Sequence, residues 1–496
     1  MNYCDDLLRQ CLTIAHRRFA LELDTGHEIS FGELRDRVER LASVLSKMGI
    51  GPGRSVIIHL HNCVDAIVLH MATQYVGARS CFVDALVQPR ALAYYVRVTN
   101  CTLLVTRSPL DQIDARVLEQ TPVLAADDLP LLAQQGSTES QRTPHDWAED
   151  DVSYIYFTSG TTSEPKGVML TPGNHANFVS ICDRYWQPVN EASRHICYVP
   201  FSHGFGTIFL VPLALRTGSE LYLLRAFHPV RVLEAILKHG ITHIYGVPSH
   251  YQQLLRLPDA SEGLKRIQMA FCAAAKLEHS LMLDWERITG TILCEGYGLI
   301  ETCCGTTWRV GEPSRGTGHM GPCPDDKLIE FGIFDEFGTK LRAGESGQIG
   351  VRGKSLMKGY LESSPEVSRS DDWFMTGDKG YITEDRHLFM TGRIKDIINI
   401  AGIKVSPYEV EAVLQKHPAV AEVAVVAAPD PLYGEVVKAY VRTATEKGVS
   451  ERDLIRFAAE HLMNFQVPKR IEFVDALPLT NLGKLDRKRL RELNPI

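Results

Sequence analysis

Several features are absent from this sequence, and each absence excludes a class of protein. The 12 cysteines form no C-x-x-C pair and none follows Cys323, so neither a disulfide framework nor a zinc knuckle fits their distribution. No apolar run reaches the roughly 18 residues of a membrane-spanning helix, and Met1–Leu12 has no signal-peptide core. The net charge is -7 with both signs interspersed, which gives no basic surface for nucleic acid. These absences predict a cytoplasmic protein without a membrane span or a nucleic-acid partner.

The length and the apolar pattern predict more than one domain. A chain of 496 residues exceeds a single hydrophobic core. Buried-strand runs such as Val56–Leu60 alternate with helical spacing such as Val64–Tyr75, which favours parallel sheets covered by helices. After Gly392 the pattern changes to a helix over Tyr408–Gln415 and a strand over Val420–Val426. We therefore predict an α/β protein with a large N-terminal domain of several subdomains and a small α+β C-terminal domain.

Two further stretches give weaker signals. Pro122–Asp151 is rich in Gln, Ser, Thr and Asp and is interpreted as an irregular surface connection. Apolar residues alternate over Gly347–Arg352 and over Tyr381–Met390, which indicates strands of a more antiparallel portion.

The densest chemical signal is a Gly/Ser/Thr loop with a lysine over residues 158–167, directly after a predicted strand. Glycines allow backbone N–H groups to turn toward an anion, hydroxyls donate hydrogen bonds, and a lysine adds positive charge. Such clusters are usually plain turns, but the preceding strand and the order of residues favour a polyphosphate ligand. The loop is not a Walker A motif, because Pro165 replaces its last Gly. The residues expected to bind phosphate are Thr158, Ser159, Gly160, Thr161, Thr162 and Lys166.

This loop resembles the signature loop of the adenylate-forming superfamily, which includes acyl-CoA synthetases, adenylation domains of peptide synthetases and firefly luciferase. Ser163 stands where the family usually has Gly. Later motifs that resemble those of the family follow in its order. They are Gly296–Thr302, Thr376–Asp378, Gly392–Asp396, Ile400–Val405 and Pro478–Lys484.

The resemblance implies a role for each matching residue. Tyr297 would stack on adenine, Asp378 would accept hydrogen bonds from the ribose, and Arg393 would also reach the nucleotide. Glu301 would hold Mg²⁺, a cation that prefers oxygen ligands. Other residues that the resemblance assigns are Ala274 in the nucleotide site, Lys395 at the hinge, Gly402 in the thiol tunnel and Lys484 as the catalytic lysine. The expected boundaries are an N-terminal domain over 1–391, a hinge over 392–395 and a mobile C-terminal domain over 396–496.

One motif position departs from the family pattern. The family usually has Thr before the metal-binding Glu, with its hydroxyl on the α-phosphate, whereas this chain has Ile300. Thr302 is not assumed to replace it. Either activation is slower, or other donors hold the phosphate.

The segment Pro200–Gly206 carries the information on the acid. Amino-acid-activating relatives have Asp after its Phe, where this chain has Ser202, and His203 matches the His of acyl- and aryl-acid relatives, which gives it a catalytic place. An apolar acyl pocket is expected, as in most ligand sites. Its predicted walls are Ser202, Phe205, Val247, Ala273 and Leu299. We therefore predict an uncharged acyl or aryl acid as substrate.

The resemblance implies an ATP-dependent ligase that converts a carboxylic acid to acyl-AMP, releases pyrophosphate and transfers the acyl group to a thiol. The acceptor would be CoA or the phosphopantetheine of an acyl or peptidyl carrier protein. Lys484, His203 and Lys166 would be the catalytic residues. Two alternatives remain at this point: an adenylating enzyme for an amino acid or with a non-thiol acceptor, and a non-catalytic nucleotide-binding relative.

Overall fold

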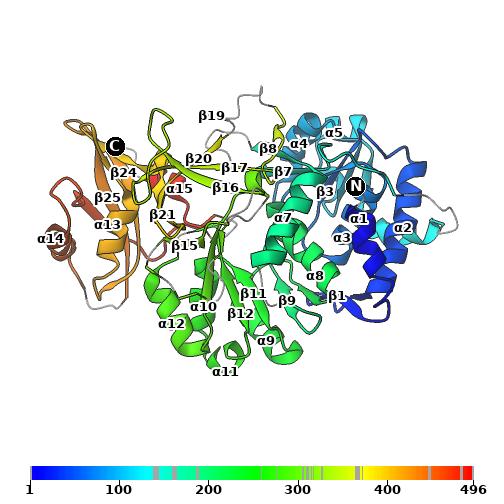
Figure 1. Ribbon diagram of the computed structural model, residues 1–496, viewed down its shortest axis with the longest axis horizontal. Helices are drawn as coiled ribbons and strands as arrows, with labels where there is room; N and C mark the ends of the chain where they lie inside the picture. Colours follow the sequence, from blue (N-terminus) through cyan, green and yellow to red (C-terminus); the bar gives the residue numbers. More distant parts are fainter. Residues whose placement is uncertain are drawn as a thin grey trace.

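The computed structural model describes residues 3–137, 144–158, 165–185, 189–258, 260–275, 277–303, 307–308, 312–313, 315–316, 318–324, 328–362, 369–370, 373–444, 448–480 and 484–493. In these residues the strands form four sheets. Figure 1 shows the last sheet and its helices at one end of an elongated molecule, with the N-terminal elements at the other.

Two of the sheets are mainly parallel and buried. Their strands are continuous apolar runs, because helices cover them and leave little of either face to solvent; all five residues of β3 are buried, for example. The first sheet has the order β14-β13-β12-β11-β9-β10-β1-β2. Its strands are β1 (Arg18–Glu22), β2 (Glu28–Ser30), β9 (Arg194–Cys197), β10 (Glu220–Leu223), β11 (His243–Gly246), β12 (Met269–Cys272), β13 (Leu293–Tyr297) and β14 (Thr307–Trp308).

The second sheet has the order β18-β8-β7-β4-β3-β5-β6. Its strands are β3 (Ser55–His59), β4 (Arg79–Phe82), β5 (Leu103–Thr106), β6 (Val123–Ala125), β7 (Tyr154–Thr158), β8 (Lys166–Leu170) and β18 (Gly359–Tyr360). One hydrophobic core joins the two sheets, with Phe82 and Tyr156 of the second beside Tyr245 and Phe271 of the first.

The third and fourth sheets are largely antiparallel. The third, ordered β15-β21-β20-β17-β16 with β19 on β20, comprises β15 (His319–Pro322), β16 (Glu330–Phe334), β17 (Gly347–Arg352), β19 (Arg369–Ser370), β20 (Trp373–Ile382) and β21 (His387–Arg393). The fourth, ordered β23-β22-β25-β24 with β26 on β25, comprises β22 (Ile398–Ile400), β23 (Ile403–Val405), β24 (Val420–Asp430), β25 (Gly434–Thr443) and β26 (Arg470–Phe473). The fourth sheet has a core of its own, built on Val425, Val437 and Leu454.

The helices pack on these sheets through amphipathic faces. Helix α2 begins with a capping box in which the Ser30 hydroxyl accepts from the Glu33 N–H and the Glu33 carboxylate accepts from the Ser30 N–H. The helices are α1 (Tyr3–Gln10), α2 (Phe31–Lys47), α3 (Val64–Tyr75), α4 (Leu92–Thr99), α5 (Ala115–Gln120), α6 (Leu129–Gln135), α7 (Pro172–Tyr185), α8 (Val211–Thr217), α9 (Pro229–His239), α10 (Pro248–Leu255), α11 (Ala260–Leu264), α12 (His279–Thr289), α13 (Pro407–Leu414), α14 (Glu451–His461) and α15 (Arg487–Glu492).

The predicted fold class is confirmed, and one local prediction was wrong. Pro122–Asp151 is not wholly irregular, because it contains β6 and α6, whose Leu129 and Ala133 face the core. The antiparallel portion predicted from Gly347–Arg352 and Tyr381–Met390 is confirmed, since β17 pairs with β20 and β20 with β21, both antiparallel. The second stretch includes the turn between the two strands, because β20 ends at Ile382 and β21 begins at His387.

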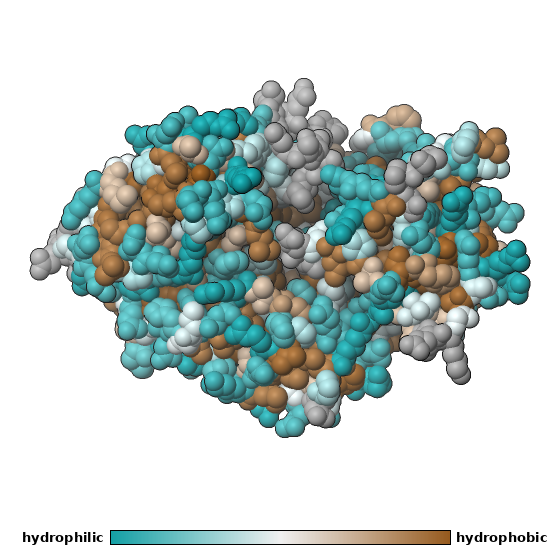
Figure 2. Space-filling view, turned by 180° about the vertical axis from the view of Figure 1, so that it is seen from behind, coloured by the Kyte–Doolittle hydropathy of each residue, from teal (hydrophilic) through white to brown (hydrophobic). Residues whose placement is uncertain are grey.

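The surface and the cysteines agree with the sequence reading. Hydrophilic residues are spread between smaller hydrophobic groups on the face shown in Figure 2. No helix in the described ranges has the length and apolar character needed to span a membrane. The ten cysteines for which the structure gives a state are free, and all of them are buried except the half-buried Cys101.

Asn174 connects α7 to the segment between β17 of the third sheet and β18 of the second. Its side-chain amide donates to the carbonyls of Lys354 at 2.8 Å and Leu356 at 2.6 Å, and its oxygen accepts from the Thr171 N–H at 3.0 Å. Asn174 is 7% exposed, so these groups have little access to water. This segment also donates a hydrogen bond to the turn after β13 of the first sheet, from the Met357 N–H to the Glu301 carbonyl.

We expect Asn174→Ala to destabilise the N-terminal domain. Each buried group left without a partner costs about 1–3 kcal/mol, so the first thermal transition should fall by roughly 4 °C or more. Differential scanning calorimetry would measure the shift. Asn177→Ala is the matched control, since it removes one half-buried bond within α7. Equal shifts of the transition temperature in the two variants would show that the Asn174 hydrogen bonds stabilise the domain no more than the Asn177 bond does.

Candidate active site

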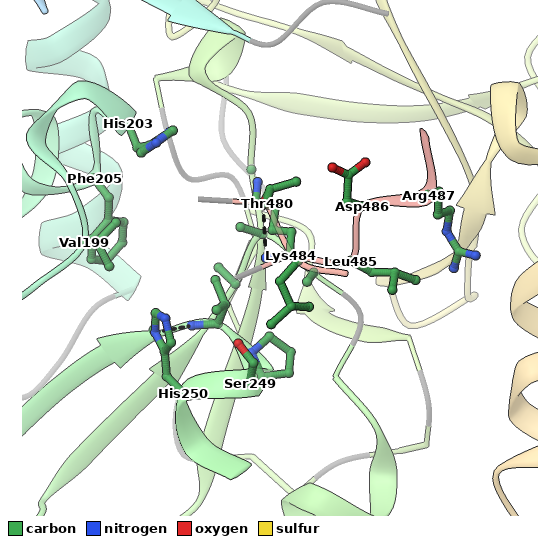
Figure 3. Close-up of a pocket in the computed structure, with 18 of the residues that line it drawn as sticks. Val199, His203, Phe205, Ser249, His250, Thr480, Lys484, Leu485, Asp486 and Arg487 are labelled. Carbon is green, nitrogen blue, oxygen red and sulfur yellow. Dashed lines mark hydrogen bonds between the residues drawn. The ribbon is translucent and has the colours of Figure 1, made fainter. Parts of the chain in front are cut away.

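A cavity of about 2590 Å³ lies where the two parallel sheets, the third sheet and the C-terminal segment meet. The carboxyl ends of β7, β9, β11, β12 and β13 open into it, which is where ligands bind in parallel α/β sheets. Figure 3 shows its walls coming from distant parts of the chain, with His203 and Phe205 on one side and Lys484 to Arg487 on the other.

A buried carboxylate organises one side of the cavity. Asp378 is 2% exposed. Its Oδ2 accepts from the Tyr297 hydroxyl at 2.7 Å, and its Oδ1 is 3.0 Å from Nε of Arg393. Burial raises the pKa of Asp378, whereas Arg393 opposes that shift. Asp378 and Arg393 are cross-strand partners on β20 and β21, while Tyr297 ends β13 of the first sheet, so three sequence-predicted residues meet here.

Lys484 reaches the same place from the C-terminal segment. The described residues on either side of 481–483 are paired, since the Thr480 N–H donates to the Lys484 carbonyl at 2.7 Å and Leu479 forms a bridge with Leu485. Burial and, to a lesser degree, the positive charge of Arg393 lower the pKa of Lys484 to about 8, against the opposing effect of Asp378. The amino group of Lys484 therefore lies near Asp378 and Arg393 and is partly deprotonated at mildly alkaline pH.

The predicted phosphate loop is bordered by Thr158 and Lys166, and both line the cavity; its residues 159–164, with Ser159, Gly160, Thr161 and Thr162, lie outside the described residues. Lys166 Nζ is 5.2 Å from the centre of the Tyr360 ring. The Tyr360 hydroxyl donates to Oε1 of Glu301 at 2.9 Å. Tyr360 was missed by the sequence analysis, because a lone Gly-Tyr gives no signal until β18 pairs with β8 beside Lys166.

Glu301 is a half-buried carboxylate with a neutral hydrogen-bond donor. Desolvation raises its pKa, and the Tyr360 hydrogen bond partly offsets the rise. A carboxylate that faces a cavity and has only a tyrosine hydroxyl as side-chain donor among the described residues is a good ligand for a hard divalent cation. The described residues contain no group of three or more His, Cys, Asp or Glu that would bind a metal without further ligands.

The hydroxyl that follows Glu301 is already in use. Thr302 is fully buried, and its Oγ1 donates to the Leu299 carbonyl at 3.0 Å and accepts from the Leu299 N–H at 3.1 Å. Ile300 lines the cavity and packs against the main core. Thr302 therefore does not supply the hydroxyl that Ile300 lacks.

The predicted acyl walls all line the cavity, and the apolar part is aromatic. Phe205 lies 5.4 Å from Tyr245 and 6.0 Å from Phe271, measured between ring centres. Ala274 has a φ of 69°, a left-handed conformation that is uncommon for residues other than glycine. The walls that the structure brings to the cavity are Ser202, Phe205, Val247, Ala273, Ala274 and Leu299.

A carboxylate that the sequence analysis missed stands beside Ser202 and His203. The Ser202 hydroxyl donates to Oδ2 of Asp84 at 3.2 Å, and His203 Nε2 is 3.5 Å from the same oxygen. Asp84 follows β4 of the second sheet, so no local pattern connects it with Ser202. The presence of Ser202 in place of the Asp of amino-acid-activating relatives therefore does not leave this region without a carboxylate.

The two remaining predicted residues differ in position. Lys395 lines the cavity in the short turn after β21, and burial lowers its pKa. Gly402 is exposed in the β22–β23 turn and is not among the cavity-lining residues. The turn is held near the third sheet by an ion pair between Lys404 and Glu336 at 3.1 Å.

A cavity at the carboxyl ends of parallel strands that gathers lysines, an arginine, carboxylates and a tyrosine from several elements fits an anionic nucleotide. Comparison with known proteins identifies the family. Sequence models of the AMP-binding enzyme and of the AMP-binding enzyme C-terminal domain match residues 9–361 and 409–484.

Curated relatives and solved structures agree with these matches. A long-chain-fatty-acid–CoA ligase of Bacillus subtilis is 28% identical, over 94% of this chain and 90% of its own length. ATP-bound MatB from Rhodopseudomonas palustris superimposes with a TM-score of 0.91 at 28% identity, covering 99% of both chains. O-succinylbenzoate coenzyme A synthetase of Bacillus subtilis, solved with ATP and a magnesium ion, gives 0.83 at 25% identity over 98% of each chain. The chain belongs to the AMP-binding enzyme family, which confirms the resemblance found in the sequence.

The lowered pKa of Lys484 predicts how nucleotide binding depends on pH. Below about pH 8 the side chain is charged and attracts phosphate, whereas above it the free protein holds a neutral amine. We expect ATP affinity to fall roughly tenfold between pH 7 and pH 9, as measured by calorimetric titration. Lys484→Arg should flatten that decline, because a guanidinium stays charged. The same decline in both proteins would place the titrating group elsewhere.

Proposed function

We propose that the protein is an AMP-forming acid–thiol ligase that activates an uncharged acyl or aryl carboxylic acid and transfers it to CoA. The observation that carries this proposal is the meeting of Lys484 with Tyr297, Asp378 and Arg393 in one cavity. The fatty-acid relative is named a CoA ligase and the succinylbenzoate relative a coenzyme A synthetase, which supports the same activity here. A carrier-protein pantetheine is the alternative acceptor, distinguished by offering each thiol in turn. With its free cysteines, the protein fits a reducing cytoplasm.

In the first half-reaction, the acid carboxylate attacks the α-phosphorus of ATP, an acyl–phosphate bond forms, and the bond to pyrophosphate breaks. Negative charge builds on the phosphoryl oxygens. We assign its stabilisation to Lys484, Lys166 and the hydroxyls that border the 158–167 loop. Asp378 would accept from the ribose hydroxyls and Tyr297 would stack on adenine, as the family motif implies. The protein contributes mainly position and fixed charge.

Glu301 is the residue that would hold Mg²⁺, together with phosphate oxygens and water. When bound, Mg²⁺ neutralises phosphate charge. The neutral Tyr360 donor fits that role, because it orients the carboxylate without cancelling its charge.

In the second half-reaction, the thiol sulfur attacks the acyl carbon and AMP leaves. We propose that residues 396–496 move as a unit about the 392–395 hinge between the two half-reactions, which would withdraw Lys484 and bring Gly402 to the thiol path. Two features support a hinge here: β21 ends at Arg393, and Gly392 has a φ of 150° with the Tyr408 ring against it. A β-carbon at Gly392 would lie 2.8 Å from that ring.

The acid is best read as one without an ammonium group. Asp84 already accepts from the Ser202 hydroxyl and from the Leu86 N–H, and it faces His203. An ammonium group on the substrate would therefore be buried without a dedicated partner, at a cost of several kcal/mol by rough estimate.

Acid-dependent exchange of pyrophosphate into ATP tests both the function and the acid class. We expect exchange with aliphatic or aryl acids, and thioester formation when CoA is added. Matched pairs such as 3-phenylpropanoate and phenylalanine should differ by at least about tenfold in favour of the acid without the amine. Absence of exchange across a broad panel contradicts the proposed function, while an α-amino acid as best substrate contradicts only the acid class.

The side chain at Ile300 predicts that one substitution will increase the rate of adenylate formation. Ile300→Thr supplies a hydroxyl at the cavity wall, and a hydrogen bond to a charged group is worth about 1.5–3 kcal/mol. If that bond strengthens toward the transition state, adenylate formation should be about tenfold faster or more. Single-turnover formation of acyl-AMP measures the effect, with Ile300→Val as a control that changes volume without adding a donor. Slower turnover with a lower melting temperature would show that the core is built around Ile300.

A further inference from the structure

Asp84 and His203 come from different sheets and meet at the cavity wall. Asp84 follows β4, and His203 lies in the short turn Phe201–His203 after β9. The distance from His203 Nε2 to Asp84 Oδ2 is 3.5 Å, and both side chains are about one quarter exposed, at 25% and 22%. Figure 3 shows His203 on the wall that also carries Phe205.

The carboxylate of Asp84 is held in place by its other contacts. Its Oδ1 accepts from the Leu86 N–H at 2.9 Å, and its Oδ2 accepts from the Ser202 hydroxyl at 3.2 Å. Burial raises the pKa of Asp84, but His203 and the Leu86 N–H outweigh it and keep the pKa below its usual value. Asp84 is thus an ionised group with a set orientation toward the imidazole.

The arrangement selects one form of the imidazole. A carboxylate next to Nε2 favours the tautomer that carries its proton on Nε2, so Nδ1 becomes the basic nitrogen. The same carboxylate stabilises the imidazolium once Nδ1 is protonated. Both effects act on a histidine that lines the cavity with the acyl walls.

We propose that Asp84 is a positioning residue for thiol transfer, which holds His203 as the general base that takes the proton of the attacking thiol. This inference rests on the proposed function. The proton moves from sulfur to Nδ1, a carbon–sulfur bond forms, and the bond from the acyl carbon to the AMP oxygen breaks with its electron pair on AMP. The imidazolium then returns its proton to solvent.

Other titratable groups face Asp84 and have to be separated from His203 in a pH profile. They are His59 of β3 and His61 after it, whose pKa values burial lowers, and Tyr95 of α4, whose pKa burial raises. Arg225 and Arg107 act on His61 as well. If Asp84→Asn changes the pH profile of transfer and His203→Gln does not, the change comes from these neighbouring groups. The two variants are therefore measured together.

The experiment measures the two half-reactions of the full-length protein separately. Asp84→Asn should slow single-turnover transfer from preformed acyl-AMP to CoA by about 10- to 100-fold, while acid-dependent pyrophosphate exchange changes less than about threefold. The acidic limb of the transfer profile should change in Asp84→Asn, because the imidazole loses the carboxylate beside its Nε2. In His203→Gln that limb should disappear. Asp84→Glu should restore part of the rate.

Three controls make the outcome specific. Asp65→Asn removes a carboxylate ion-paired with Arg37 and Arg107 away from the cavity and should leave the ratio of the two rates unchanged. Lys484→Ala should show the opposite pattern, with exchange lost and transfer retained. Retained exchange in Asp84→Asn also reports that it is folded.

Two outcomes overturn the inference. One is an equal loss of both half-reactions in Asp84→Asn, which would mean that Asp84 shapes the whole cavity. The other is normal transfer with an unshifted pH profile. Asp84→Glu keeps the test open if Asp84→Asn does not fold, because a displaced carboxylate should reduce the rate of transfer more than the rate of exchange. A wild-type protein without acid-dependent exchange would instead contradict the proposed function.

Discussion

The active region depends on one buried carboxylate that cannot stay buried alone. Asp378 is nearly inaccessible to water, and an unpaired charge there would be costly. Arg393 and Tyr297 satisfy it from different directions, one from the neighbouring strand and the other from the end of a strand in the first sheet. The contact therefore joins two sheets, and it does so one residue before the chain turns toward the C-terminal domain.

The neighbouring charges follow from that arrangement. Arg393 is needed to balance Asp378, but its positive charge then lowers the pKa of Lys484 in the same confined space. A cavity lined by the cations Arg393, Lys395 and Lys484 is well matched to a polyphosphate, whose negative charge would balance them. The preference for a nucleotide is thus a property of how these residues share a buried site, and the family comparison agrees with it.

The opposite wall of the cavity, which carries Phe205 and His203, has a different composition. Apolar and aromatic groups around Phe205 provide shape, and a single polar cluster of Asp84, Ser202 and His203 lies at their edge. Separating phosphate-facing cations from a carboxylate–imidazole pair allows each half-reaction its own charge environment.

The sequence by itself determined the fold class, most strands and helices, and the identity of Lys166, Tyr297, Asp378, Arg393 and Lys484 as cavity residues, because short ordered motifs and apolar periodicity are local signals. It misread Pro122–Asp151, where local polarity hid β6 and α6. Only the tertiary structure decided which side chains touch. Asp84 and Ser202 are 118 residues apart and Tyr360 and Glu301 are 59 apart. Such pairs depend on the stacking of separate sheets, and no local pattern encodes the distance between them.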